Sequence, residues 1–404
     1  MVRKILEKKI NVAIYSGIMP APNFIENLIK LIGDEKINIY LFGNGTSVKY
    51  KNSNIKVFST PQGKLDIICF VFFQLIRLFV SYPNKLYKLV RNYKVFSRSG
   101  SIFRSLSKIL PVLNHTPDIF HIQWAKSLPF WFFLKEIYGV KIVLSLRGSH
   151  INYSAIANDS LAREYNFFFP KIDKMHAVSE RIAQKAEKFG ADRDKIDVIY
   201  SSLNFSHLKT FEKISYKTHK PFQFLSVGRF HWVKGYQYSI SAIAKLKKMN
   251  KNFHYVIITK NNISEEILYQ IDELSLENHI EIVNPISQDN VYEIMRESDC
   301  LILPSVQEGI SNVVLESMSI GLPVISSDCG GMKEIINHGR NGFYFPARDS
   351  YALKKLLLKV MNLKKEEREK IIENGKNYIN EHFNPNFIKS EIHNLYIKTI
   401  ETEN

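Results

Sequence analysis

Residues 299–327 read DCLILPSVQEGISNVVLESMSIGLPVISS, and this pattern decides the fold class. The apolar run 299–305 is typical of a buried strand, and residues 323–328 form a second run of the same kind. Between them, the apolar stretch 313–320 ends at Gly321, as a buried helix commonly does. A strand, a helix and a second strand in this order predict a βαβ unit with parallel strands.

Two acidic residues, Glu308 and Glu316, interrupt this nearly uncharged unit. A carboxylate in water-poor surroundings is costly unless it has a partner. We expect Glu308 in the loop before the helix and Glu316 in about its first turn, with Ser311 or Asn312 as the N-cap. The free N–H groups of such a helix start suit a phosphate, and carboxylates suit the vicinal hydroxyls of a sugar or ribose. The alternative is a helix-start acid and a buried ion pair.

The bulk composition indicates two globular domains. A chain of 404 residues with 45% hydrophobic residues exceeds the usual size of a single core. The three cysteines, Cys69, Cys300 and Cys329, form no CxxC pair, which argues against a disulfide framework or a cysteine zinc site and fits a reducing, cytoplasmic compartment. The basic then apolar residues 1–17 predict a first strand rather than a secretory signal. The apolar run 65–80 is too short and too charged for a membrane span.

Strands and helices alternate twice along the chain, which predicts an α/β protein with two Rossmann-like domains whose parallel sheets face each other across a ligand-binding cleft. We predict an N-terminal domain over 1–203, a polar linker over 204–221, a C-terminal domain over 222–385 and a last helix over 386–404 that returns toward the N-terminal domain. The predicted strands cover residues 10–17, 37–43, 55–60, 118–124, 140–148, 173–179, 222–230, 253–259, 280–286, 299–305, 323–328 and 342–346.

The formal net charge of +16 predicts an anionic partner. Much of the excess lies in the helical segment 64–110, where basic and aromatic residues alternate and Asp66 is the single acid. Such a segment fits the anionic inner face of a plasma membrane, to which the protein would bind peripherally. A solvated basic face over an ordinary core helix explains it equally well. No nucleic-acid-binding motif is present, so we do not expect nucleic acid as a partner.

The pattern PSxxEG-x6-E followed by GLPV resembles the signature of retaining glycosyltransferase family 4, the group 1 glycosyltransferases, which have the two-domain GT-B fold. Three further stretches agree with that family in order and spacing, namely SVGRFHWVKG (226–235), SQDNVYEIMRESDCLILPS (287–305) and SDCGGMKEIINHGRNGFYF (327–345). The resemblance covers most of residues 222–346 and is looser over the N-terminal half.

The resemblance implies that the C-terminal domain binds a nucleotide sugar, a UDP- or GDP-sugar, with no cofactor and no required metal. The implied donor site consists of Gly228, Arg229, Lys234, Pro285, Ile286, Glu308, Gly309, Ile310, Ser311, Asn312 and Glu316. Arg229 and Lys234 would hold the diphosphate, Glu316 the ribose and Glu308 the transferred sugar. The backbone of 309–311 would cradle oxygens, and Pro285 and Ile286 would line the base.

In the N-terminal, acceptor-side half, Arg147 occupies the position of a histidine found in many members of the family. Arg147 or the nearby His150 could bind a sugar hydroxyl or a phosphate of the donor, so both are candidate catalytic residues; a purely structural loop is the alternative. His121 ends a strand and either lines the acceptor side or is a satisfied core histidine. The double-glycine loop of the family is reduced to Gly17.

These observations predict a retaining hexosyltransferase that acts on a surface glycan, such as a lipid-linked oligosaccharide, a lipopolysaccharide or a capsule. A non-catalytic GT-B scaffold and a GT-B phosphorylase or synthase acting on a soluble sugar remain alternatives. A nicotinamide-dependent oxidoreductase is disfavoured because GNGTSV (43–48) lacks the third glycine of the dinucleotide fingerprint.

Overall fold

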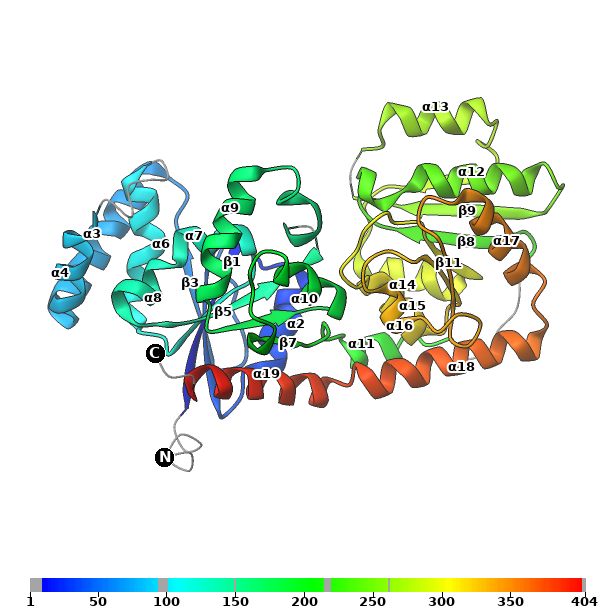
Figure 1. Ribbon diagram of the computed structural model, residues 1–404. Helices are drawn as coiled ribbons and strands as arrows, with labels where there is room; N and C mark the ends of the chain where they lie inside the picture. The colour runs from blue at the N-terminus through cyan, green and yellow to red at the C-terminus, as the bar shows by residue number, and fades with distance from the viewer. Residues whose placement is uncertain (1–8, 94–100, 149, 214–218, 261, 402–404) are drawn as a thin grey trace. The chain divides into compact units, whose positions relative to one another are not determined.

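The computed structural model describes residues 9–93, 101–148, 150–213, 219–260 and 262–401. The chain divides into two compact units, shown in Figure 1. Unit 1 comprises Met1–Val178, Ile182–Ser202 and Ile388–Asn404, and unit 2 comprises Ser179–Arg181 and Leu203–Phe387. Each unit is built around its own parallel sheet, which confirms the predicted fold class of two Rossmann-like domains.

Unit 1 contains a seven-stranded sheet in the order β3-β2-β1-β4-β5-β6-β7. Its strands are β1 (Ile10–Met19), β2 (Ile37–Gly45), β3 (Ile55–Thr60), β4 (Ile119–Ile122), β5 (Lys141–Leu146), β6 (Lys174–Ala177) and β7 (Ile196–Val198). The strand order reverses between β1 and β4, so the switch point where such sheets bind ligands lies at the carboxyl ends of these two strands.

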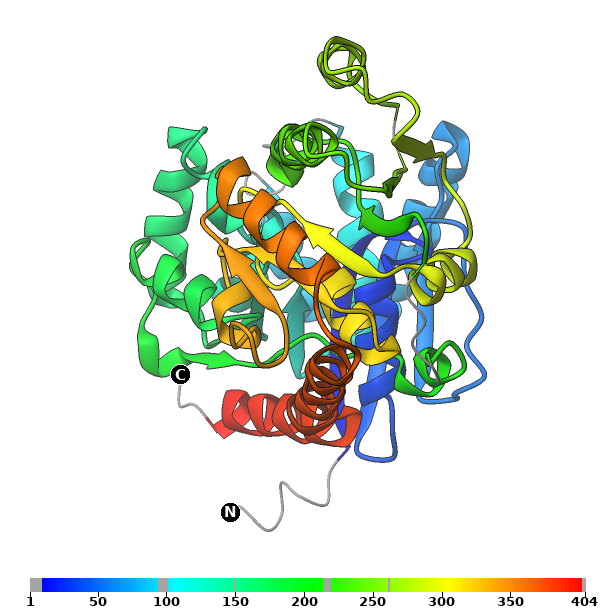
Figure 2. The same ribbon diagram turned by 90° about the vertical axis from the view of Figure 1, so that its right-hand side faces the viewer.

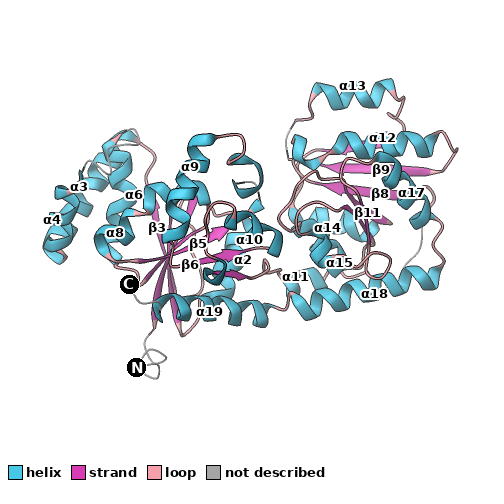
Figure 3. Cartoon of the chain, viewed as in Figure 1, coloured by secondary structure: helices cyan, strands magenta, loops and turns pink. Residues whose placement is uncertain are grey.

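Helices cover both faces of this sheet, as Figure 3 shows. Those lying wholly or mostly in unit 1 are α2 (Asn23–Ile32), α3 (Lys64–Ser81), α4 (Pro83–Arg91), α6 (Ile102–His115), α7 (Leu128–Trp131), α8 (Phe133–Tyr138), α9 (Asp159–Phe168), α10 (Glu180–Glu187) and α19 (Pro385–Glu401). Alternate residues of β1 enter different cores: Ala13 packs with Ile109 of α6, whereas Ile14 packs with Ile392 of α19. This alternation explains why the strand is apolar throughout.

Unit 2 contains a six-stranded parallel sheet in the order β10-β9-β8-β11-β12-β13. Its strands are β8 (Phe222–Val227), β9 (Phe253–Ile258), β10 (Ile280–Val283), β11 (Cys300–Leu303), β12 (Val324–Ser327) and β13 (Phe343–Phe345). Here the order reverses between β8 and β11, and the loops that leave these two strands carry most of the predicted donor-site residues.

The helices of unit 2 are α11 (Phe205–Lys209), α12 (Tyr236–Lys247), α13 (Glu265–Glu273), α14 (Gln288–Glu297), α15 (Asn312–Ile320), α16 (Met332–Ile335), α17 (Ser350–Met361) and α18 (Lys365–His382). α15 is the helix predicted from the opening stretch, and it packs against α18 and the strands β11 and β12. α13 stands apart from the sheet on the far side of α12 (Figure 2).

The structure differs from the predicted elements in several places. A single helix is expected near 127–138, but the structure divides it at Phe132 into α7, which carries Pro129 in its first turn, and α8. Helix α9 and strand β7 were not predicted. The predicted linker 204–221 begins with α11, whose buried Leu208 anchors it against α15; residues 214–218 of that linker lie outside the described residues.

Candidate functional site

Two loops of unit 2 meet at the switch point of its sheet. One is the turn Trp232–Lys234 after β8, and the other follows β11. The backbone N–H of Val306 donates to the carbonyl of Val233 at 2.7 Å, which joins them. Gly235 permits this approach: it has a φ of +65°, and a Cβ atom there would lie 2.2 Å from the carbonyl oxygen of Pro304.

The partner of Glu308 is Lys234. The Nζ atom of Lys234 lies 2.7 Å from Oε1 of Glu308, and the hydroxyl of Ser305 donates to the same oxygen at 2.8 Å. Both charged side chains are partly buried. The two residues that were predicted to bind different parts of one ligand therefore neutralise each other in this structure, as in the ion-pair alternative.

The glycine pair after β12 supports the loop that carries Glu308. Gly331 donates from its backbone N–H to the carbonyl of Gly309 at 2.8 Å. Gly330 has a φ of +56°, and a Cβ atom there would lie 1.9 Å from the carbonyl oxygen of Glu308. Because a backbone oxygen at that distance has no room to yield, only glycine fits this position.

Glu316 lies at the start of the second turn of α15, close to its predicted place, since the helix begins at Asn312 after Ser311. The hydroxyl of Tyr292, on α14, donates to Oε1 of Glu316 at 3.2 Å and accepts from the Nε2 atom of Gln288 at 2.6 Å. Burial raises the pKa of Glu316 to about 7. A carboxylate with this pKa changes its charge in the physiological range and has one hydroxyl donor already in place.

The other predicted donor-site residues lie at strand ends of the same sheet. Arg229 follows Gly228 directly after β8, and its side chain is exposed. In the described part of unit 2, Arg229 forms no ion pair. Pro285 and Ile286 follow β10; Pro285 is exposed and Ile286 partly buried. The structure thus joins Lys234 to Glu308 directly, whereas Arg229 remains separate from that pair.

Around α15, Gly309 and Ser311 are buried, while Ile310 and Asn312 are partly buried. Ser311 occupies the N-cap position, yet its side chain makes no capping hydrogen bond. The free N–H groups of this helix start are the feature that suits a phosphate oxygen.

In unit 1, His121 is completely buried, and both of its ring nitrogens have partners. Nδ1 lies 2.8 Å from the hydroxyl of Tyr396, and Nε2 lies 2.9 Å from Oγ of Ser145. That oxygen lies 3.0 Å from Nδ1 of His176, whose Nε2 lies 2.8 Å from the carbonyl of Ile199. His121 is therefore a satisfied core histidine, the second of the two predicted possibilities, and lines no surface.

The end of this chain of hydrogen bonds determines its direction. The carbonyl of Ile199 can only accept, so His176 carries its proton on Nε2 and accepts through Nδ1. Ser145 then donates to His176, His121 donates to Ser145, and Tyr396 donates to His121. Burial lowers the pKa of His176 to about 3 and that of His121 well below its usual range, so both rings are neutral.

Arg147 and His150 occupy the loop after β5. Nη2 of Arg147 donates to Oε1 of Gln123 at 2.9 Å, and the guanidinium lies 4.2 Å from the ring centre of Phe24. Burial lowers the pKa of Arg147 to about 9, and its buried Nε has no hydrogen-bond partner among the described residues. Burial likewise lowers the pKa of His150 to about 4.

His150 packs near Trp124, with ring centres 5.4 Å apart, and its buried Nδ1 has no partner among the described residues. The indole N–H of Trp124 donates to the carbonyl of Ser16 at 3.0 Å, beside Gly17, whose φ is +84°. Gly17 thus lies inside β1, at the register shift after Tyr15, whereas Arg147 and His150 follow the carboxyl end of β5 in the same unit.

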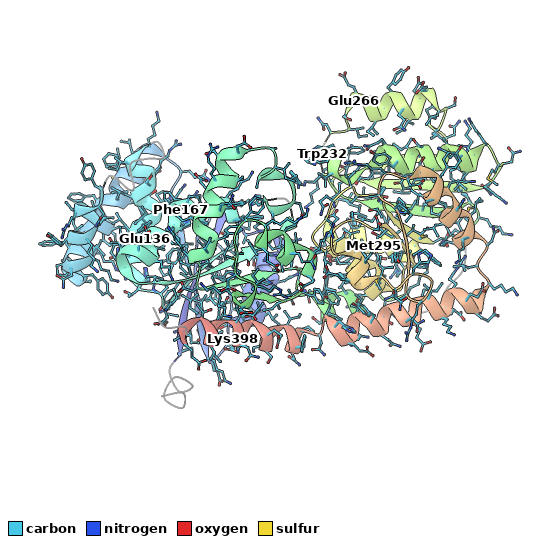
Figure 4. The ribbon with its side chains drawn as sticks, viewed as in Figure 1. Glu136, Phe167, Trp232, Glu266, Met295 and Lys398 are labelled. Carbon is cyan, nitrogen blue, oxygen red and sulfur yellow. The ribbon has the colours of Figure 1, made fainter. Side chains whose placement is uncertain are left out.

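Sequence reasoning missed Tyr292, Ser305, Gln123 and Trp124. Each touches a predicted residue. Tyr292 and Ser305 lie within stretches that carry the family resemblance but were given no role there, whereas Gln123 and Trp124 lie in no such motif. Trp232, labelled in Figure 4, was likewise overlooked: its side chain is 56% exposed in the turn that carries Lys234. The only sequence signal for Trp232 was its place two residues before the predicted ligand Lys234.

Comparison with known proteins supports the resemblance. Residues 209–378 match the family described as glycosyl transferases group 1, and residues 64–206 match glycosyltransferase family 4. The amylovoran biosynthesis glycosyltransferase of Erwinia amylovora is 28% identical over 233 residues, which are 56% of this chain and 56% of that protein. The chain thus spans little more than half the length of that relative.

The N-acetyl-alpha-D-glucosaminyl L-malate synthase of Bacillus anthracis is 25% identical over 339 residues, covering 81% of this chain and 87% of that enzyme. A solved structure of the Anabaena protein HepE in complex with UDP has a TM-score of 0.68 at 16% identity, covering 96% of this chain and 99% of that chain. At this identity the likeness concerns the fold alone. With both family matches and two parallel-sheet units, the chain belongs to the group 1 glycosyltransferases and has the GT-B fold.

Proposed function

We propose that this protein is a retaining glycosyltransferase that moves a hexose from a nucleotide sugar to a hydroxyl of a surface glycan. The observation that carries the proposal is the Lys234–Glu308 ion pair, held at the switch point of the unit 2 sheet beside a helix start. A scaffold protein would have no need to keep a cation and a carboxylate partly buried there, since such a pair contributes little net stability.

The ion pair suggests how the donor enters. The diphosphate of a nucleotide sugar offers Lys234 a stronger anionic partner than one carboxylate. Once Lys234 turns to the diphosphate, Glu308 is free to accept hydrogen bonds from hydroxyls of the transferred sugar. Arg229, exposed at the end of β8, supplies a second cation for the charge that develops as the diphosphate leaves.

Glu316 is the proposed ribose ligand. A carboxylate accepts two hydrogen bonds from vicinal hydroxyls, and Tyr292 already shows that Glu316 accepts from a hydroxyl group. With the leaving diphosphate neutralised by Arg229 and Lys234, one of its oxygens would take the proton of the acceptor hydroxyl, and the anomeric configuration would be retained. Independence from a metal ion is part of this proposal.

The proposed acceptor is a lipid-linked oligosaccharide, a lipopolysaccharide or a capsular glycan, and the proposed location is the cytoplasmic face of the membrane. Two observations support this choice. One relative is named for the biosynthesis of amylovoran, and the segment 64–93 of this chain places apolar and basic side chains on its surface.

The first test is a thermal-shift screen over UDP, GDP and ADP and their hexose conjugates. A ligand that binds only the folded protein raises the melting temperature. We expect one nucleotide to do so with the unmodified protein and a weaker effect with Lys234→Ala. Lys248→Ala, which removes an exposed cation at the end of α12, is the matched control.

The second test is transfer with the donor that the screen identifies. Lys234→Ala and Glu308→Gln should each lower the rate by roughly 10²- to 10³-fold, as the loss of one electrostatic contact in a transition state does. NMR of the product should show the donor's anomeric configuration. Unchanged rates in both variants, or an inverted product, would contradict the proposed site or mechanism.

A further inference from the structure

The outer side of α3 carries a stripe of apolar side chains at the protein surface. Leu65, Ile68, Phe72, Ile76 and Phe79 recur at helical spacing, and all are exposed; Phe72 is 67% and Phe79 65% exposed. A surface helix of a soluble domain is normally polar on its solvent side, and a contiguous apolar patch marks an interaction site. The stripe therefore indicates a partner outside this unit.

The inner side of α3 fixes the direction in which the stripe points. Ile67, Val71 and Leu78 are buried there, where α3 packs against α6. The buried amide of Asn114, on α6, donates through Nδ2 to Oε1 of Gln74 at 2.7 Å and to the carbonyl of Gln74 at 3.1 Å. Rotating α3 to bury the stripe would break these two hydrogen bonds and expose the inner residues, so the stripe stays outside.

Neighbouring elements extend the apolar surface. Tyr87 and Val90 of α4 are 65% and 63% exposed, and Ile102 and Phe103 in the first turn of α6 are also exposed. α3 and α4 lie at the end of unit 1, beyond α6 as seen from the sheet (Figure 1), and their side chains extend outward in Figure 4. We call α3, α4 and the first turn of α6 the α3–α4 surface.

The charges of the α3–α4 surface indicate what the partner is. Its exposed cations are Lys64, Arg77, Lys88, Arg91 and Arg104. Among the described residues, none of these five forms an ion pair with a carboxylate. Asp66 is the single acid between Lys64 and Asp118. Two copies of this surface would bring like charges together, which opposes self-association, whereas anionic lipid headgroups would neutralise the cations.

We propose that the α3–α4 surface binds the headgroup layer of an anionic lipid bilayer, with α3 lying along the membrane and its apolar stripe inserted between the lipids. None of the helices in the described ranges has the length and apolarity needed to cross a membrane. The 18 residues of α3, roughly 27 Å long, suit a position in the plane of the interface. This inference rests on the proposed function, because a transferase that uses a lipid-linked acceptor works where that acceptor is held.

Co-sedimentation with vesicles tests the inference. We expect the full chain to sediment with vesicles of phosphatidylglycerol and phosphatidylcholine, and much less with phosphatidylcholine alone. Phe72→Ser/Phe79→Ser should lower the apparent partition coefficient by roughly tenfold or more, since it removes two large apolar side chains from the inserted face. Leu268→Ser/Tyr269→Ser, on exposed positions of α13 in unit 2, is the matched control and should bind normally.

Two further measurements separate insertion from charge attraction alone. Lys88→Gln/Arg91→Gln should weaken binding at low salt and leave a smaller salt dependence. Phe72→Trp should show a blue-shifted tryptophan emission on addition of the anionic vesicles, quenched by brominated acyl chains. Vesicle binding without any change for Phe72→Ser/Phe79→Ser would overturn the inserted stripe.

The nucleotide thermal shift is measured on the same variants. If the shift persists while vesicles fail to bind, the membrane inference is wrong and the proposed donor site stands; if vesicles bind and no nucleotide shifts the melting temperature, the proposed function is wrong instead. Sedimentation velocity tests the remaining possible partner, a second copy of this chain. A dimer that Phe72→Ser/Phe79→Ser dissociates, in a protein that does not bind vesicles, would identify the surface as an interface between two copies.

Discussion

Unit 2 holds its polar site as charges that neutralise each other, whereas unit 1 holds its polar cluster as neutral rings joined by hydrogen bonds. Lys234 and Glu308 are partly buried and need an ionic partner. His121 and His176 are fully enclosed and lose their charge instead. An ion pair can exchange one partner for a charged ligand, while a chain of neutral donors and acceptors has nothing to exchange. The difference separates a binding site from a structural support.

Two buried titratable groups, Glu316 in unit 2 and His176 in unit 1, contribute to stability with opposite dependence on pH. Burial raises the pKa of Glu316 to about 7. The neutral carboxyl therefore contributes to the free energy of unfolding below pH 4.5, and this contribution is lost as the pH rises through 7. The pKa of His176 is lowered to about 3, so its contribution is present above pH 6.5 and is lost as the pH falls toward 3. The predictions below test this contrast.

The largest effect is expected for Gly330→Ala. A Cβ atom 1.9 Å from the carbonyl oxygen of Glu308 forces the two loops apart, and the φ of +56° adds strain. We expect a loss of at least about 4 kcal/mol in the free energy of unfolding, measured by denaturant titration. Gly339→Ala is the matched control: Gly339 has a φ of +79° but no atom near its Cβ position.

Gly339→Ala should cost only about 1 kcal/mol, the strain of the left-handed backbone alone. Equal losses in the two variants would show that backbone conformation, and not the close approach of the two loops, makes Gly330 necessary. The ion-pair site in unit 2 would then not depend on the close approach between the glycine turn and the loop of Glu308.

The next effect, with opposite sign, is expected for Glu316→Gln. Ionising a carboxyl whose pKa is raised from 4.5 to about 7 costs roughly 3 kcal/mol above pH 7. The variant should therefore be more stable than the unmodified protein at pH 8 by up to that amount and equal to it at pH 4.5. It should also bind nucleotide more weakly, since an amide accepts fewer hydrogen bonds from the ribose than a carboxylate does.

Thermal unfolding over this pH range checks the stability difference, and calorimetry checks nucleotide affinity. Glu373→Gln, which replaces an exposed carboxylate on α18, should change neither quantity. A Glu316→Gln variant that loses stability at pH 8 would show that the charge of Glu316 has a stabilising partner in the ligand-free protein, and the proposed ribose role would need another basis.

The smallest effect is expected for Ser145→Ala in unit 1. It leaves one buried donor on His121 and one buried acceptor on His176 without a partner, at a cost of roughly 2 kcal/mol. Hydrogen exchange of the β5 and β6 amides measures this loss locally. In the unmodified protein, the free energy of opening of the same amides, corrected for the intrinsic pH dependence of exchange, should fall below pH 6.5 by up to about 1.4 kcal/mol per pH unit for each buried histidine.

Ser81→Ala, at an exposed position at the end of α3, is the control and should leave this exchange unchanged. If unit 1 kept full protection at pH 5, His121 and His176 would not be the neutral rings that the direction of the hydrogen-bond chain requires. Unit 1 and unit 2 would then not differ in the way described above.

Most of both sheets could be predicted from the sequence because buried parallel strands are short apolar runs between turn residues. Strand β7 escaped because it covers only Ile196–Val198 and one of its residues, Asp197, is charged. Helix α9 escaped because only two of its ten residues, Leu161 and Tyr165, are buried, so they form no long apolar stripe. The division between α7 and α8 escaped because it falls at Phe132, inside the aromatic run 130–133, where no turn residue marks it.

The candidate site was predictable in its members but not in its pairings. Glu308 and Lys234 were both expected to face a ligand, and the structure shows that they contact each other across 74 positions of sequence. Arg147 or His150 was expected to bind a donor group, with a structural loop as the alternative, and the structure shows the guanidinium of Arg147 held by Gln123 and Phe24. The sequence left His121 as either an acceptor-side residue or a core histidine, and its complete burial shows that it is a core histidine.

The sequence by itself determined the fold class and the family and indicated candidate residues for a donor site, because local spacing encodes buried strands, helix starts and the acids and cations beside them. Only the tertiary structure decided which of these groups are paired, which histidines are enclosed, and that α3 shows an apolar face to the outside. Those properties depend on contacts between distant segments, such as Gln74 with Asn114, whose free energies no local pattern records.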